Sequence, residues 1–192
     1  MKLILDILLG LGLAEATGIR PFLPALVAGG AARGNVLVDF GGTQFAFLES
    51  SWWLAAMAAL ALVGLILRNE IAQRPPLVAA VQGLGMGMGA LLFCGALADD
   101  GYAWWPGIPA GLAAAWVSGT AVRDLFARAA ARLDDEARSH LPVYGEGVAI
   151  LLAALSIIAP PVSLIALAFF IWLLIGGRRR RAAKYEGLRT LR

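Results

Sequence analysis

The sequence predicts an all-α membrane protein, a bundle of about six membrane-spanning helices. Of its 192 residues, 60% are hydrophobic and only 15% are charged, and the mean hydropathy is +0.77. Soluble domains carry about 25% charged residues. Several apolar runs also approach or exceed about 18 residues, the length at which an apolar helix can cross a bilayer. We therefore expect one transmembrane domain at 1–177 and a basic cytoplasmic tail at 178–192.

The first apolar segment, from Leu3 to about Ala32, is too long for one straight crossing, which needs about 20 residues. Proline lacks the N–H that would bond to the preceding turn, so Pro21 and Pro24 predict a break in the helix. We expect two half-helices that together make the first crossing, with a re-entrant hairpin as the alternative. Broken backbone at membrane depth is tolerated only inside protein or beside water.

This break carries charged residues that a passive lipid anchor does not need. Glu15 and Arg20 place a carboxylate and a guanidinium at or near membrane depth, where a charge costs about 2.5–3.5 kcal/mol by insertion scales. Glu146, which opens the fifth predicted span, is a second carboxylate near that depth. We expect Arg20 to pair with Glu15 or Glu146, or to face a wet cavity that one of them also lines. The candidate binding residues are Arg20, Glu15, Glu146, Thr17 and Gly18.

Residues 35–47 predict a short β-hairpin on the extracytoplasmic side. Alternating apolar residues flank a Gly41-Gly42 pair, which is typical of a two-residue hairpin turn. An isolated hairpin is marginal in water, so we expect it to lie on the spans, as a linker or as a lid over the first span. The alternating residues are Val36, Val38, Phe40, Phe45 and Phe47.

Spans 2 to 4 are predicted at 51–67, 77–98 and 106–122. Trp52-Trp53 and Trp104-Trp105 mark interfacial ends, because indoles prefer the membrane–water boundary. Span 3 contains two Gly-x-x-x-Gly pairs and span 4 carries a small residue at every fourth position, patterns that let helices approach closely. We expect the two spans to pack through Gly83, Gly85, Gly87 and Gly89 on one and Gly107, Gly111, Ala115 and Gly119 on the other.

Residues 123–140 predict an amphipathic helix on the bilayer surface. Apolar residues recur there with helical spacing, beginning with Val122, Leu125 and Phe126. Two further spans are expected at 143–159 and 162–175, and the run Arg178–Arg181 then acts as a stop-transfer anchor that also binds anionic lipids.

Basic residues orient the predicted spans, because loops rich in Lys and Arg stay in the cytoplasm. With six spans and the N-terminus inside, 14 of the 16 Lys and Arg residues face the cytoplasm, while Arg33 lies outside and Arg20 is embedded. We therefore predict a multi-pass protein of the bacterial inner (plasma) membrane with both termini in the cytoplasm.

The motif Gly18-Ile-Arg-Pro-Phe-Leu-Pro24, together with Glu146 at the start of the penultimate span, resembles a family of small bacterial inner-membrane proteins known only as a domain of unknown function. The likeness runs from Leu11 to about Ile175. Where members tend to have an acidic pair, this chain has Glu146-Gly147. The resemblance implies an inner-membrane location and supplies no reaction and no ligand.

Two functions fit these features. Translocation of a small solute, ion or lipid headgroup would use the broken first span, because discontinuous helices surround ligands near the midplane of transporters. A non-catalytic membrane assembly or interaction subunit would use the small-residue faces instead, with Arg20 in a structural Arg/Glu ion pair. We favour translocation and keep the assembly subunit as the alternative.

No motif of a hydrolase, zinc enzyme or phosphate-binding loop is present, so we lean against an enzyme and predict no catalytic residue, metal site or cofactor. Cys94 and His140 are single and do not form a Cys/His zinc pattern. The expected partners are the lipid bilayer and anionic lipids at the basic tail. A second copy of the chain, in a homo-oligomer, is kept as a further alternative. Nucleic acid is not expected, because no aromatic or folded module accompanies the basic run.

Overall fold

The computed structural model describes the backbone of residues 2–189 and, within them, all side chains except those of Asn69, 135–139 and 178–189. Within this part of the chain there are eight α-helices, one 3₁₀ helix and no strand, which confirms the all-α prediction. The helices are α1 (Lys2–Ile19), α2 (Leu23–Arg33), the 3₁₀ helix η1 (Ala46–Glu49), α3 (Ser51–Ile66), α4 (Arg68–Gln73), α5 (Pro75–Asp99), α6 (Gly107–Ala130), α7 (Asp135–Ile158) and α8 (Val162–Arg189).

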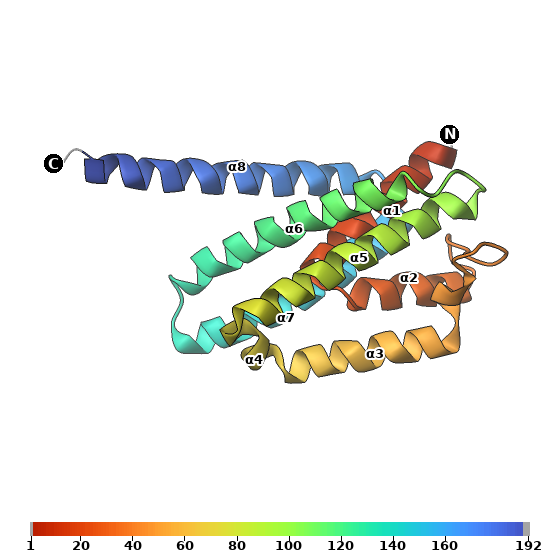
Figure 1. The fold of residues 1–192 in the computed structure, drawn as a ribbon, viewed down its shortest axis with the longest axis horizontal. Coiled ribbons are helices and arrows are strands. Elements are labelled where there is room, and N and C mark those ends of the chain that lie inside the picture. The colour runs from red at the N-terminus through yellow and green to blue at the C-terminus, as the bar shows by residue number, and fades with distance from the viewer. Residues whose placement is uncertain (1, 190–192) are drawn as a thin grey trace.

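The central helix of the bundle is α1 (Figure 1). It contacts α2, α5, α6, α7 and α8. Glycines on α1 allow these contacts to be close. A Cβ atom at Gly10 would lie 2.8 Å from the ring of Phe93, and one at Gly18 would overlap the carbonyl oxygen of Ala115. Most of α1 from Leu8 onward is buried, namely residues 8–10 and 12–17.

Successive long helices alternate in direction, so the chain passes back and forth along the bundle (Figure 1). This includes α1 and α2, which form an antiparallel pair around the break at 20–22. The two helices therefore form a hairpin, and they do not continue in one direction as the two half-helices of a single crossing would. With 11 residues, α2 is about 16 Å long, about half of a bilayer core.

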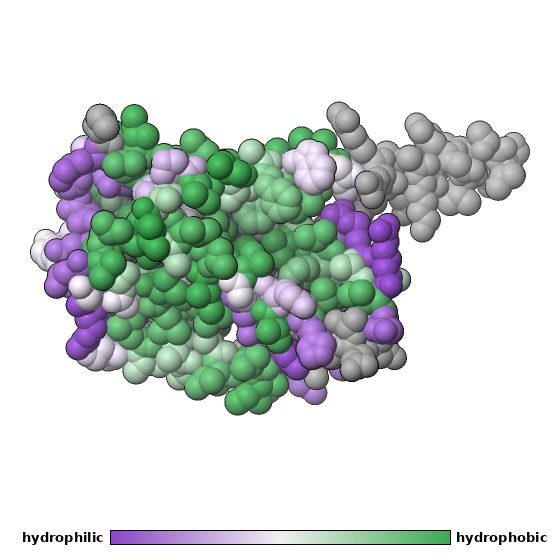
Figure 2. Space-filling model, turned by 180° about the vertical axis from the view of Figure 1, so that it is seen from behind, coloured by the Kyte–Doolittle hydropathy of each residue, from purple (hydrophilic) through white to green (hydrophobic). Residues whose placement is uncertain are grey.

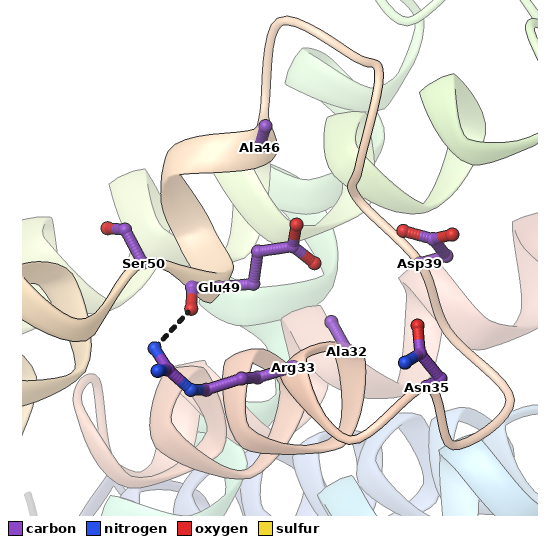
Figure 3. Close-up of a pocket in the computed structure, with 7 residues that line it drawn as sticks. All are labelled: Ala32, Arg33, Asn35, Asp39, Ala46, Glu49 and Ser50. Carbon is purple, nitrogen blue, oxygen red and sulfur yellow. Dashed lines mark hydrogen bonds between the residues drawn. The ribbon is translucent and has the colours of Figure 1, made fainter.

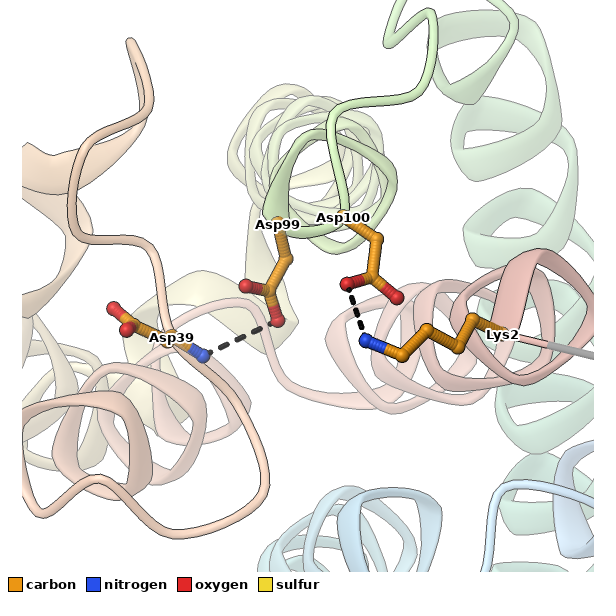
Figure 4. A network of polar contacts seen from close by, with 4 residues as sticks. All are labelled: Lys2, Asp39, Asp99 and Asp100. Atoms are coloured by element: carbon orange, nitrogen blue, oxygen red, sulfur yellow. Dashed lines mark hydrogen bonds and ion pairs between the residues drawn. The ribbon is translucent and has the colours of Figure 1, made fainter.

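One end of the bundle, here called the acidic end, carries most of its charge on carboxylates. Lys2 Nζ forms an ion pair with Asp100 Oδ1 at 3.1 Å, and the backbone N–H of Asp39 donates to Asp99 Oδ2 at 3.3 Å (Figure 4). These contacts join the start of α1 and the loop after α2 to the end of α5. The acidic residues of this end are Asp6, Asp39, Glu49, Asp99 and Asp100.

The opposite end, here called the basic end, contains the break after α1, the α3–α5 connection and the α6–α7 connection. Arg20 Nη2 donates to the carbonyl of Pro142 near the start of α7, at 3.2 Å. The helix α8 also runs to this end, where a Cβ at Gly177 would lie 2.5 Å from Arg128 Nη1. Its described basic side chains are Arg20, Arg68, Arg74, Arg123, Arg128 and Arg132.

The start of α1 and the end of α8 consequently lie at opposite ends of the bundle (Figure 1). This differs from the prediction that both termini share one side. The physical reason is the reversal at 20–22, because α1 and α2 make two passages where the prediction counted one. The helix α8 continues through Arg178–Arg181. The side chains of the predicted basic tail, 178–192, lie outside the described residues.

The predicted β-hairpin at 35–47 does not form. Residues 34–45 make an irregular loop that leads into η1, and Thr43 bonds to Phe40 through both its backbone N–H (3.2 Å) and its hydroxyl (2.8 Å). The alternating apolar residues are used for packing: Val38 and Phe40 are buried, and the Phe40 ring would lie 2.9 Å from a Cβ at Gly95. The loop closes the acidic end of the bundle.

The predicted surface helix at 123–140 is also absent as a separate element. Residues 123–130 are the last turns of α6, a turn follows at 131–134, and α7 begins at Asp135. Val122 is buried, and Leu125 and Phe126 pack against the core, so the apolar stripe faces the bundle and extends α6.

The expected close packing of α5 on α6 is found at Gly89, Gly107, Gly111 and Ala115, whereas Gly85 and Gly119 pack on α1. A Cβ at Gly111 would lie 2.5 Å from the carbonyl oxygen of Gly89, and one at Gly119 would lie 2.5 Å from that of Gly18. Around Gly83 and Gly87 there is no atom within 4 Å of such a Cβ, so this pair faces outward.

Two helices are long and apolar enough to cross a membrane by themselves, Pro75–Asp99 and His140–Ile158. Ser51–Ile66 and Val162–Gly177 are shorter apolar helices. Length and composition thus agree with a membrane protein, but they do not reach the six spans predicted.

Candidate functional site

The break between α1 and α2 is a direct product of the local sequence. The backbone N–H of Arg20 still bonds to the carbonyl of Ala16, at 3.1 Å, as the last turn of α1. Pro21 then has no N–H to offer, and the chain turns. Pro24 falls in the first turn of α2, where the missing N–H costs nothing because first-turn donors have no helical partner. The side chain of Arg20 therefore projects from the end of α1.

A cavity lies beyond the end of α1. Near Gly85, α5 touches the last turn of α1, since a Cβ there would lie 2.7 Å from the carbonyl oxygen of Thr17. The preceding part of α5 extends past the break, where α1 no longer covers it. The space, about 560 Å³, is bounded by residues 18–23, 60–65 of α3, α4, and parts of α5, α6 and α7. We call it the break cavity.

The walls of the break cavity are mostly apolar, and its polar side chains include three arginines. Arg20 comes from the break, Arg68 from the start of α4 and Arg123 from α6. Gln82 of α5 and Glu146 of α7 also line it, so one carboxylate faces three guanidinium groups. The site can therefore attract an anion.

Arg20 is only partly satisfied. Its Nη2 bonds to the carbonyl of Pro142 at 3.2 Å, but its buried Nε has no hydrogen-bond partner among the described residues. Glu146 lies near enough to attract Arg20, yet neither Glu146 nor Glu15 forms an ion pair with it within 4.0 Å. A guanidinium has five N–H donors, so donors remain for a ligand.

Arg123 is held in place by the chain. Its Nε donates to the carbonyl of Gly119 at 2.9 Å, and its Nη1 donates to Gln82 Oε1 at 2.5 Å. Because Gly119 itself packs against Gly18, these bonds fix Arg123 beside the break.

The five predicted binding residues separate into two groups. Arg20, Gly18 and Glu146 line the break cavity, whereas Glu15 and Thr17 do not. Thr17 is fully buried and donates its hydroxyl to the carbonyl of Ala14 at 2.8 Å. Glu15 is fully buried in the helix packing, and its two carboxylate oxygens have no hydrogen-bond partner in the described part of the chain.

Sequence reasoning missed Arg68, Arg123 and Gln82 as cavity residues. It ended span 2 at residue 67, just before Arg68, and it began a surface helix at Arg123. Arg68 and Arg123 directly follow the predicted spans 51–67 and 106–122, which was the available signal, but nothing in the sequence brings these two positions and Gln82 together.

A second cavity, about 390 Å³, lies at the acidic end and is lined by seven residues (Figure 3). Its cation, Arg33, already donates to the carbonyl of Glu49 at 3.5 Å and to Ser51 Oγ at 2.6 Å. These bonds tie the end of α2 to the start of α3. The second cavity therefore fits loop closure better than ligand binding.

A family model described as "Domain of unknown function (DUF4126)" matches residues 7–180. The chain belongs to this family. The match includes all helices that form the break cavity, and it confirms the resemblance to a family known only as a domain of unknown function. No curated protein and no solved structure gives a match to the chain.

Proposed function

We propose that this protein crosses the membrane several times and uses the break cavity to bind and translocate a small anionic solute or a lipid headgroup. The observation that carries the proposal is the meeting of Arg20, Arg68 and Arg123 in one cavity at a helix break. Half-helix ends and unwound backbone surround ligands in transporters, and embedded arginines mark substrate pathways.

The surface supports a transmembrane position. Figure 2 shows hydrophobic residues filling a broad band between hydrophilic residues at the two ends. Trp52 and Trp105, which are 64% and 65% exposed, both lie at the acidic end, as interfacial indoles do.

The arrangement of helices fits seven passages, the eight α-helices less the short α4. Of these, α2 is too short to cross the whole bilayer and would reach about half its depth. The basic end then faces the cytoplasm, because loops rich in Lys and Arg remain there. The end of α8 is cytoplasmic and the start of α1 is extracytoplasmic, in the inner (plasma) membrane of a bacterium.

A flux experiment tests translocation. Purified protein would be reconstituted into vesicles with radiolabelled phosphate inside, and separately with a fluorescent phosphatidylglycerol whose crossing is followed by chemical quenching. We expect one of the two probes to cross at least tenfold faster than in protein-free vesicles, and Arg20→Leu to remove that gain. Arg33→Leu, at the acidic end, is the matched control and keeps it. If neither probe moves faster with protein, the translocation proposal is wrong.

An assembly subunit remains the second candidate, and one observation favours it. Gly83 and Gly87 present a small-residue pair on the outward face of α5 that nothing in the described chain covers. Such a pair is typical of a helix–helix contact between membrane proteins, including a second copy of this chain. The structural Arg/Glu ion pair expected for this function is absent at Arg20, which weighs against it.

A further inference from the structure

One side of the break cavity opens between α3 and α5. These two helices follow one another in the chain, joined by α4, yet no Cα atom of α3 lies within 8 Å of a Cα atom of α5, whereas α2, η1 and α4 come that close to α3. Met57 is the single buried residue of α3. The C-terminal half of α3 therefore stands away from α5.

The surfaces that face this opening are apolar. Residues 60–65 of α3 and Val78, Val81 and Leu84 of α5 line it. Leu62 is 60% exposed and Leu84 is 51% exposed. In a membrane this opening faces the hydrocarbon core, so its natural occupant is an apolar chain.

Charge is confined to one end of the same space. Arg20, Arg68 and Arg123 lie toward the basic end, and among the described residues that line the cavity Glu146 is the only carboxylate. Arg20 and Arg68 are near enough to repel one another. Glu70, the nearest acid on α4, is engaged by Arg74 at 3.3 Å and does not line the cavity. An anion placed between the arginines relieves the repulsion and accepts from the unpartnered Arg20 Nε.

We propose that the break cavity holds an anionic phospholipid, with its phosphate between Arg20, Arg68 and Arg123 and an acyl chain in the opening between α3 and α5. This rests on the proposed function, in which the cavity binds an anion, and adds the substrate class. The polar end and the apolar opening match the two halves of a lipid. A volume of about 560 Å³ is suited to a headgroup with part of one chain.

Binding would be measured on the intact protein in a non-ionic detergent, by native mass spectrometry and by the shift in unfolding temperature. Three probes separate head from tail: phosphatidylglycerol, phosphatidylcholine with the same chains, and glycerol 3-phosphate. We expect phosphatidylglycerol to bind at least tenfold more tightly than either of the others. Arg20→Leu should weaken its binding at least tenfold, and Arg33→Leu should leave it unchanged.

A second variant tests the chain separately from the headgroup. Val81→Trp fills the opening between α3 and α5 and leaves the arginines in place. It should therefore weaken the binding of phosphatidylglycerol at least tenfold and leave the binding of glycerol 3-phosphate unchanged. If glycerol 3-phosphate binds as tightly as phosphatidylglycerol, and Val81→Trp affects neither, the lipid inference falls while the anion site stands. If no probe binds, or Arg20→Leu changes nothing, the anion site falls as well.

Discussion

The two halves of α5 lie in opposite surroundings although they belong to one uninterrupted helix. Every buried residue of α5 lies in its C-terminal half, from Gly85 to Leu97, against α1 and α6. None of the residues from Pro75 to Leu84 is buried, and three of these apolar side chains line the break cavity. Both halves are mainly apolar, so hydrophobicity alone is not the cause.

The cause is the length of α1. This helix ends at Ile19 because Pro21 follows, and α5 continues beyond that point without its partner. The same proline therefore breaks one helix and uncovers another. A cavity made in this way forms within the helix bundle and needs no separate domain. Its charged residues come from helix ends that meet at the basic end.

The packed half should be the less tolerant of added volume. Gly111→Leu inserts a side chain where even a Cβ atom would lie 2.5 Å from the carbonyl of Gly89. Overpacking of this kind costs typically about 1–3 kcal/mol, and we expect about 3 kcal/mol, because the obstacle is backbone. Thermal unfolding in detergent measures it. Gly87→Leu, with open space around it, should match the parent. Equal unfolding temperatures for the two variants would mean that α5 and α6 are not in contact there.

Removing side-chain volume should also have different effects on stability in the two halves of α5. Leu92 is fully buried in the packed half and Leu84 is half exposed beside the cavity. Leu92→Ala leaves a void and should cost about 2 kcal/mol, whereas Leu84→Ala should cost less than about 0.5 kcal/mol. The free energy of unfolding of both variants would be compared in one detergent. A larger loss of unfolding free energy at position 84 than at position 92 would contradict the assignment of the core to the C-terminal half of α5.

The smallest effect is expected from one hydrogen bond between α6 and α1, the two helices that cover the packed half of α5. Ser118 Oγ donates to the carbonyl of Glu15 at 2.7 Å and is fully buried. Ser118→Ala should lower the free energy of unfolding by about 1 kcal/mol. Thr120→Ala is the control, because Thr120 Oγ1 bonds only within its own helix, to Trp116 at 2.6 Å. If the Ser118→Ala variant is as stable as the control, this hydrogen bond does not stabilise the core.

The sequence predicted helix boundaries well where proline sets them. The predicted spans 143–159 and 162–175 are separated by Pro160-Pro161, and α7 and α8 are separated at the same place. The break before Pro21 was also predicted. These features are local, because a missing N–H acts on the adjacent turn whatever the rest of the chain does.

Features that depend on which helices meet were predicted poorly. The reversal of α2 on α1 places the start of α1 and the end of α8 at opposite ends of the bundle. Alternation around Phe40 indicated a strand, but the ring was needed to pack on Gly95. Arg20 and Glu146 were chosen for their charge and do line the cavity, while Glu15 was chosen for the same reason and lies in the packing. The sequence shows charged residues within an apolar segment, but it does not tell which side of a helix each of them occupies.

The central place of α1 also has a consequence for synthesis. Its closest partners, α5 and α6, are made much later, and the bond from Ser118 to Glu15 spans 103 residues. Until α6 emerges, α1 lacks the contacts at Gly18 and the hydrogen bond to the carbonyl of Glu15. The first three helices therefore have no finished core to dock on, and a nascent chain that stalls before α6 should be open to degradation.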